Sequence, residues 1–427
     1  MSFVVTKSSP PALVLPSKPT PAGDIPLTST DKSRLFFSFT SFHVFERPIH
    51  EPAQTIRRAL SQALVYYYPV AGRVAVGTGG QGGVHLACTG EGVAFVSATA
   101  SCTLQDVACL DAPPVIPLAE LALQYGGCCR ISDPLLLIQV TEFACGGYIV
   151  AVSWNHGIAD AFGLAQLLQA VGELARGLPS PTVVPIRYDE SLPDIPQLLS
   201  AVLKQAPAGF EFKHKDFAYS DVTVPWSFIN RVKGEFRRSH AGGQPCTTFE
   251  VVTAAIWQCR TRAINASPDV PVPLVFAANV RKHIGSKDGY YCNCVSTQLV
   301  QATSGTVANG AIVDVVRLIK DTKERITESL RRNAPELELH VAPPRQSAGS
   351  RLRTCAGRRA LALPPRPPRH CWSCAGACHR DRPSPGPSSP QPTTRGGEVA
   401  AGRERDGGGE EEGYGSGWEE GVAGLAG

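Results

Sequence analysis

A break in amino-acid composition near residue 340 limits most strongly what this chain can fold into. Residues 341–427 contain 16 Gly and 11 Pro but only 7 Leu, Ile, Val and Phe residues together, and they lack Lys, Asn and Met altogether. So little apolar surface cannot offset the conformational entropy that an ordered chain loses. We therefore expect a low-complexity, disordered tail over residues 341–427, with the folded units before it.

The composition of this tail is typical of GC-rich DNA translated without selection for folding; a functional Arg- and Pro-rich linker is the alternative. The tail also carries a small group of potential zinc ligands: His370, Cys371, Cys374, Cys378 and His379. Thiolates and imidazoles are the ligands that structural zinc prefers. No second well-spaced ligand pair follows, so chance cysteines explain the group better and no metal site is predicted.

Residues 1–340 are close to electrically neutral, with 29 basic and 28 acidic side chains. Such a balance provides no global field to hold nucleic acid or an anionic membrane. No apolar run approaches the ~18 residues that span a bilayer, and the N-terminus lacks a secretory signal. We therefore expect a cytosolic protein whose 14 cysteines stay reduced.

The first 177 residues combine strand and helix patterns, which predicts an α/β domain over 1–177. Aromatic alternation indicates a strand over Leu35–Phe45, and Pro52 opens an amphipathic helix. Two apolar runs, Leu135–Thr141 and Tyr148–Trp154, read as a hairpin. Helically spaced leucines then run towards Gly177, which suits a helix stop.

Residues 178–225 are rich in proline and lack periodicity, so we expect a crossover linker there and a second domain over 226–340. The features expected in that domain are a capping box from Thr247 to Glu250, a strand over Val272–Asn279 and one long helix over Val307–Arg332.

A His156-x-x-x-Asp160 pair follows directly after the second strand of the hairpin, where functional side chains are often exposed. A neutral imidazole can take a proton from a hydroxyl or an amine near pH 7. Gly157 allows another backbone or a substrate to approach closely. Taken alone, the spacing is weak, because a hydrogen-bonded structural histidine is the usual explanation for such a residue.

Several further motifs, in a fixed order, make the pair specific. They are Val14-x-Pro16-x-x-Pro19-Thr20-Pro21 with Leu27 and Asp31, Leu64-x-x-Tyr67-Tyr68-Pro69-x-Ala71-Gly72-Arg73, Asn155-His156-Gly157-x-x-Asp160-Ala161-x-Gly163, Asn279-Val280-Arg281, and Gly289-Tyr290-Tyr291-x-Asn293. Through them residues 3–340 resemble the plant BAHD acyl-CoA-dependent acyltransferases of the HxxxD type.

The resemblance implies an α/β fold of two chloramphenicol-acetyltransferase-like domains, each with a mixed sheet flanked by helices, around a solvent channel. It implies acyl transfer from acyl-CoA to the hydroxyl or amine of a plant secondary metabolite or cell-wall precursor. His156 would be the general base, and Asp160, the other catalytic-motif residue, would pair with Arg281 to hold the loop. Acyl-CoA would be a co-substrate, the acceptor a small alcohol, phenol or amine, and the protein a monomer without a tightly bound cofactor.

The chain departs from the family in its second half. The family's late Asp-Phe-Gly-Trp-Gly motif is absent, and Cys292 stands where the family more often has Gly. We therefore expect an incomplete second domain. The alternative function is a catalytically inactive, truncated acyltransferase fragment or a ligand-binding remnant. Bacterial chloramphenicol-acetyltransferase-like and condensation domains share the motif, but they usually carry His and Gly where this chain has Asn155 and Ala161.

Overall fold

The protein is described from a computed structural model, which covers residues 3–77, 83–107, 116–126, 128–195, 222–239, 245–332 and 350–355. Within these residues the first half of the chain contains these elements: β1 Val5–Lys7, β2 Ala12–Val14, β3 Asp24–Pro26, α1 Ser29–Lys32, β4 Ser38–Phe45, α2 Pro52–Tyr66, the 3-10 turn η1 Tyr68–Ala71, β5 Arg73–Val76, β6 Val84–Ala87, β7 Val93–Ala100, β8 Leu136–Phe143, β9 Tyr148–Asn155 and α3 Ala161–Ala175.

A seven-stranded mixed sheet is the centre of this half, in the order β1-β7-β8-β9-β4-β12, with β2 also paired to β7. The expected hairpin is confirmed, because β8 and β9 are antiparallel neighbours. β7 and β8 run parallel, and β9 is antiparallel to β4 on its other side. All eight residues of β9 are buried, which explains why its sequence is an apolar run rather than an alternating one.

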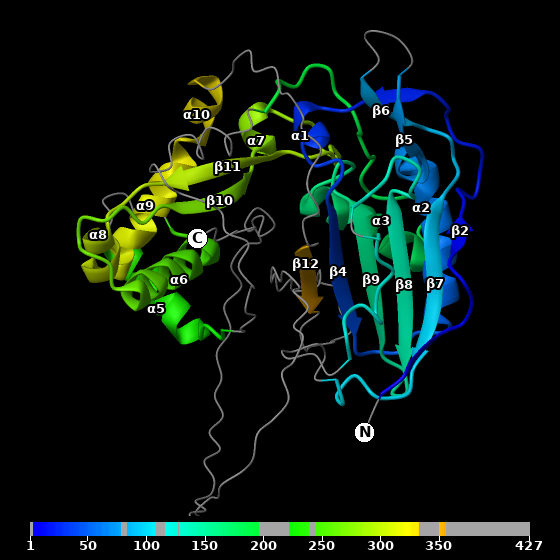
Figure 1. The fold of residues 1–427 in the computed structure, drawn as a ribbon, viewed down its shortest axis with the longest axis horizontal. Coiled ribbons are helices and arrows are strands. Elements are labelled where there is room, and N and C mark those ends of the chain that lie inside the picture. The colour runs from blue at the N-terminus through cyan, green and yellow to red at the C-terminus, as the bar shows by residue number, and fades with distance from the viewer. Residues whose placement is uncertain are drawn as a thin grey trace, which may run out of the picture.

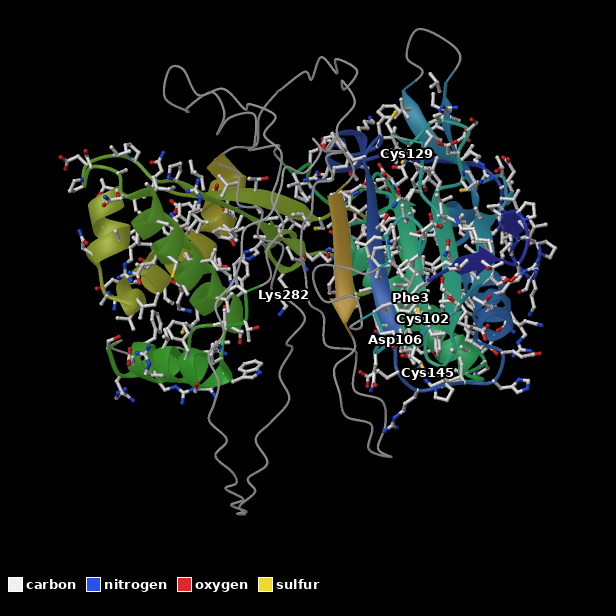
Figure 2. All side chains as sticks on the ribbon, turned by 60° about the horizontal axis from the view of Figure 1, so that its bottom comes forward. Phe3, Cys102, Asp106, Cys129, Cys145 and Lys282 are labelled. Carbon is white, nitrogen blue, oxygen red and sulfur yellow. The ribbon has the colours of Figure 1, made fainter. Side chains whose placement is uncertain are left out.

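Helices α2 and α3 pack behind this sheet (Figure 1). The apolar stripe predicted for the first of them is confirmed, since Ala59, Leu60, Ala63 and Leu64 are buried there. A second cluster, which includes Phe42, Leu104 and Ile149, fills the opposite face. Figure 2 places Phe3, Cys102 and Cys145 at the end of the sheet where β4 stops, whereas Cys129 lies at the other end. At the Cys129 end β4 starts and β9 finishes.

The second half of the chain is smaller and mostly helical. Its elements are α5 Trp226–Ser239, α6 Thr248–Ile264, β10 Leu274–Asn279, α7 Arg281–Ile284, β11 Val295–Val300, α8 Ser304–Asn309, α9 Ile312–Glu324 and α10 Ile326–Arg332. β10 and β11 form an antiparallel two-stranded sheet, which packs with α5, α6 and α9 around a separate core (Figure 1). The predicted capping box at the start of α6 is present: the Thr247 side chain accepts from the backbone of Glu250, and Glu250 accepts in return from Thr247.

The expectation of one long helix over Val307–Arg332 is wrong, because the segment forms three helices. The first break lies at Gly310, whose backbone is extended. The side-chain amide of Gln258 donates to the carbonyls of Val307 and Gly310, 2.9 Å away in each case. These two tertiary hydrogen bonds satisfy carbonyl groups that a continuous helix would have paired with its own backbone N–H groups.

Within the segment expected to be disordered, 341–427, the structure describes only residues 350–355. β12, Ser350–Cys355, pairs in parallel with β4, with Ser350 in register with Phe39. Without β12, β4 would present the unpaired backbone groups of a sheet edge, and such an edge readily accepts another strand. The rest of this segment lies outside the described residues, and so does the histidine and cysteine group at 370–379.

The expected linker contains no helix or named strand in its described parts, 178–195 and 222–225. It nevertheless makes specific contacts, because Ile186 forms an isolated parallel bridge with Tyr290. Tyr291 in turn belongs to the core of the first half. The loop at residues 290–294 therefore contacts both the expected linker and the first half of the chain. Among the described residues, no helix is both long and apolar enough to cross a membrane.

Candidate active site

The His156 turn lies directly beyond β9. The backbone N–H of His156 donates to the carbonyl of Phe37 over 2.8 Å, which ties the turn to the segment before β4. The Asn155 side chain accepts from the backbone N–H of Gly157 over 2.8 Å. A Cβ on Gly157 would come within 2.8 Å of the Cα of Leu35. Only glycine therefore lets the turn lie this close to the neighbouring segment.

The imidazole of His156 is partly buried among aromatic rings. The Phe39 ring meets it edge-on at 4.6 Å between centroids, and Trp154 lies 6.5 Å away. Burial, followed by the positive charge of Arg34, lowers the pKa of His156 to about 4. The carbonyls of His156 and Ala159 and the Asp160 carboxylate act in the opposite direction. The ring is therefore neutral at physiological pH, in the form that can accept a proton.

The two ring nitrogens of His156 have different surroundings. Nδ1 is fully buried and forms no hydrogen bond with any residue that the structure describes. The residue as a whole keeps part of its surface exposed. Nε2 is therefore the nitrogen that an incoming substrate can reach.

Asp160 is fully engaged at the start of α3 and forms no hydrogen bond with His156 within the described part of the chain. Its Oδ1 accepts from the backbone of Gly163 and from Arg281, and its Oδ2 accepts from Arg281 and from the backbone of Cys294, all four over 2.9 Å. Burial alone would raise the pKa of Asp160, but Arg281 and these donors outweigh it and hold the pKa below its usual value. Asp160 is thus a buried anion that caps a helix and joins two domains.

Arg281 extends the same network into the second half of the chain. Its Nε donates to the carbonyl of Tyr290 over 3.0 Å, and a terminal nitrogen donates to the carbonyl of Cys292 over 2.6 Å. The guanidinium also lies over the Phe162 ring, 4.6 Å from its centroid. The structure thus brings Asp160 and Arg281 together, as the sequence resemblance implied, and within the described residues neither side chain forms a hydrogen bond with the ring of His156.

A second buried ion pair lies behind the His156 turn. Both terminal nitrogens of Arg187 donate to Oδ2 of Asp31 over 3.1 Å, and the other oxygen of Asp31 accepts from the Asn293 side chain over 2.8 Å. The sequence motifs contain Asp31 and Asn293 but give neither a role. They give no signal at all for Arg187, which lies in the expected linker, or for Arg34.

The part of the chain that the structure describes contains no cluster of three or more His, Cys, Asp or Glu that could bind a metal. The described cysteines are free thiols. Burial, first of all, raises the pKa of Cys292 and of Cys294 to about 12, so both stay protonated near neutral pH. Neither thiol is therefore a thiolate nucleophile near neutral pH.

The model of the Transferase family matches residues 4–350. Acyl transferase 15 of Oryza sativa subsp. japonica is 42% identical over 80% of this chain and 79% of its own length. Myricetin 3-O-glucosyl 1,2-rhamnoside 6'-O-caffeoyltransferase AT1 of Crocosmia x crocosmiiflora is 38% identical over 76% of this chain and 78% of its own.

Solved structures show the same fold. Vinorine synthase superposes with a TM-score of 0.53 at 18% identity, over 82% of this chain and 83% of its own. Fusarium graminearum TRI101, solved with coenzyme A and T-2 mycotoxin, superposes with a TM-score of 0.53 at 15% identity, over 73% of this chain and 76% of its own.

Proposed function

The chain belongs to the BAHD family of acyl-CoA-dependent acyltransferases, and on that basis we propose that His156 is the general base of its acyl transfer. The observation that carries the proposal is a neutral, partly exposed imidazole at the junction of β9 and α3. The acceptor is the hydroxyl or amine of a plant secondary metabolite or cell-wall precursor. Acyl-CoA is the donor.

The reaction balances with this one base. The reachable nitrogen of His156 takes the proton of the acceptor as its oxygen or nitrogen attacks the thioester carbonyl carbon. The tetrahedral intermediate then collapses, the carbon–sulfur bond breaks, and the imidazolium returns its proton to the thiolate of coenzyme A. A positioned base of this kind contributes ~10²–10⁴ in rate.

Asp160 and Arg281 support the reaction without taking part in proton transfer. Every oxygen of Asp160 is already occupied by donors from Arg281, Gly163 or Cys294. A carboxylate held in this way has no free lone pair aimed at the imidazole. We assign to the pair the role of keeping the turn after β9 in place.

The named activities of relatives guide the choice of substrates. One relative is named as a caffeoyltransferase that acts on a glycosylated flavonol. A first panel therefore combines hydroxycinnamoyl-CoA, benzoyl-CoA and acetyl-CoA with flavonol glycosides and simple phenolic and aliphatic alcohols. The expected cytosolic monomer stays a prediction, which cell fractionation and gel filtration would check.

The decisive experiment compares wild type with His156→Ala and with His50→Ala, a control in which an exposed histidine is lost. We expect His156→Ala to remove nearly all turnover with the fold unchanged, and His50→Ala to have no effect. Turnover of the His156→Ala protein within a few-fold of wild type would exclude the general-base assignment. Coenzyme A binding without turnover in wild type would favour the alternative of an inactive family member.

A further inference from the structure

We propose that Asn293 is a positioning residue for His156, and that Asp31 and Arg187 hold Asn293 and the turn in place behind it. This inference rests on the proposed role of His156 as the base. It differs from the pairing of Asp160 with Arg281, which fixes the start of α3. Asn293 instead acts on the backbone of the histidine itself.

Asn293 contacts the turn at its centre. Its side-chain nitrogen donates to the carbonyl oxygen of His156 over 2.6 Å and to Oδ1 of Asp31 over 2.8 Å. Its backbone N–H also donates to that oxygen of Asp31, over 3.3 Å. Asn293 is only 1% exposed, so water cannot easily replace these bonds. A buried amide with both of its donors used has one orientation available to it.

Asp31 and Arg187 make this orientation rigid. Asp31 is 0% exposed, and its Oδ2 accepts hydrogen bonds from both terminal nitrogens of Arg187. One of these nitrogens also donates to the carbonyl of Gly157 over 3.3 Å. One hydrogen-bond network therefore binds the carbonyls of two consecutive residues, His156 and Gly157. That network joins α1, the linker and the loop before β11.

Fixing the carbonyl of His156 also fixes its ring. That carbonyl is one of the groups that favour a proton on the imidazole, so it lies close to the ring. If the Asn293 donor is lost, the turn can loosen and water can reach the imidazole. The charged groups that act on the ring are Arg34 and Asp160, and Asp160 is paired with Arg281. The network behind the turn adds a second ion pair, Asp31 with Arg187. None of these groups is removed by a change at Asn293.

The test measures the ring directly, so it does not depend on turnover. Protein labelled with ¹⁵N-histidine would be titrated by NMR, and the His156→Ala spectrum would identify the signal. We expect Asn293→Ala to raise the ring pKa by about 1 pH unit towards its ordinary value. Burial is the largest cause of the lowered pKa, so better hydration outweighs the smaller, opposite effect of a displaced His156 carbonyl. Where activity is measurable, Asn293→Ala should lower kcat more than it changes KM.

Gln258→Ala is the matched control. Gln258 is also a buried amide, and its side-chain nitrogen also donates to two acceptors, the carbonyls of Val307 and Gly310. It lies in the separate core of the second half. Gln258→Ala should therefore cost stability without moving the His156 titration. An equal shift in both variants, or no shift in Asn293→Ala, would overturn the proposal.

Two further measurements keep the proposal testable if Asn293→Ala folds poorly. Asn293→Ser keeps a short donor and should give an intermediate shift. In wild type, the side-chain amide protons of Asn293 should exchange slowly with solvent, and fast exchange there would refute the proposal without any variant. A different outcome would separate the two proposals. If Asn293→Ala shows the expected shift of the His156 pKa but His156→Ala keeps its turnover, the proposed function is rejected and the positioning role of Asn293 stands.

Discussion

At the scale of single residues, the proposed mechanism requires one neutral histidine, His156. Burial does most to keep it neutral, and Arg34 adds a positive charge that disfavours a second one nearby. Thr30 and Ser33 hold the Arg34 guanidinium at 3.1 and 3.2 Å. Arg34 was not marked by any sequence motif, yet it is the charged residue that acts most strongly against protonation of His156.

The pH dependence of turnover follows from this. kcat/KM should be constant through neutral pH and fall only as the pH approaches about 4, where the ring becomes protonated. Arg34→Gln should move this acid limb to higher pH, because it removes the repulsive charge. Arg57→Gln, which changes an exposed arginine of α2, is the control. An acid limb that is unchanged in Arg34→Gln would show that Arg34 does not influence the base.

The same shift affects stability, with a definite sign. The folded pKa of His156 lies below its unfolded value of about 6.5, so the unfolded chain binds more protons between the two. This histidine therefore lowers the free energy of unfolding as the pH falls from about 6.5 through about 4, and it has no effect above that window.

At the scale of elements, the start of α3 joins the two halves of the molecule. Asp160 caps this helix and binds Arg281, and Gly163 lies against the carbonyl of Tyr291. One turn of helix thus carries an N-cap, a buried ion pair and a close backbone contact between domains.

The ion pair should show strong coupling. Asp160→Ala or Arg281→Ala each leaves a buried charge without its partner, which costs ~3–5 kcal/mol of unfolding free energy. In the double variant neither charge remains, so we expect the loss to be smaller than the sum of the two single losses by ~0.5–3 kcal/mol. Urea unfolding of the four proteins measures this coupling, and simple additivity would mean that the two residues do not interact.

Gly163 offers a test of the domain contact. Alanine is usually better than glycine inside a helix, by up to about 1 kcal/mol. At Gly163, however, the added Cβ would overlap the carbonyl of Tyr291. Gly163→Ala should therefore lower the melting temperature. Gly172→Ala in the same helix, where the new Cβ meets only the flexible end of Arg176 at 3.3 Å, should leave it unchanged or raise it. Equal effects of the two changes would argue against a close contact at Gly163.

At the scale of the whole molecule, the two halves are unequal. The first has a seven-stranded sheet with cores on both faces, and the second has only the pair β10 and β11. Within the described residues, each strand of that pair has one neighbour and one open edge. Open strand edges promote association between chains.

The family resemblance implies a monomer, but the open edges of β10 and β11 lead us to expect that recombinant residues 1–427 self-associate as concentration rises. We also expect weak binding of coenzyme A, because the second domain is expected to be incomplete. Light scattering over a concentration series and a coenzyme A titration would measure the two effects. Thr297→Lys, which places a charge on β11, should reduce association, since edge lysines oppose strand pairing. A wild-type protein that stays monodisperse and turns over substrates rapidly would contradict the expectation of an incomplete second domain.

The sequence by itself determined the local structure around the site. The strand β9, the turn at His156, the helix α3 and the capping box at Thr247 each depend on residues a few positions apart, which periodicity and capping rules describe. The ordered motifs also carried the family and therefore the expected pairing of Asp160 with Arg281.

Only the tertiary structure decided which distant groups meet. Asp31 and Asn293 are separated by 262 positions, and Arg187 lies 156 positions from Asp31, so no local pattern relates them. The break in the helix at Gly310 depends on Gln258, and β12 forms because β4 has an edge to pair with. Asp31, Asn293, Arg187 and Gln258 are buried polar groups that need partners, and the folded chain, rather than the neighbouring sequence, supplies them.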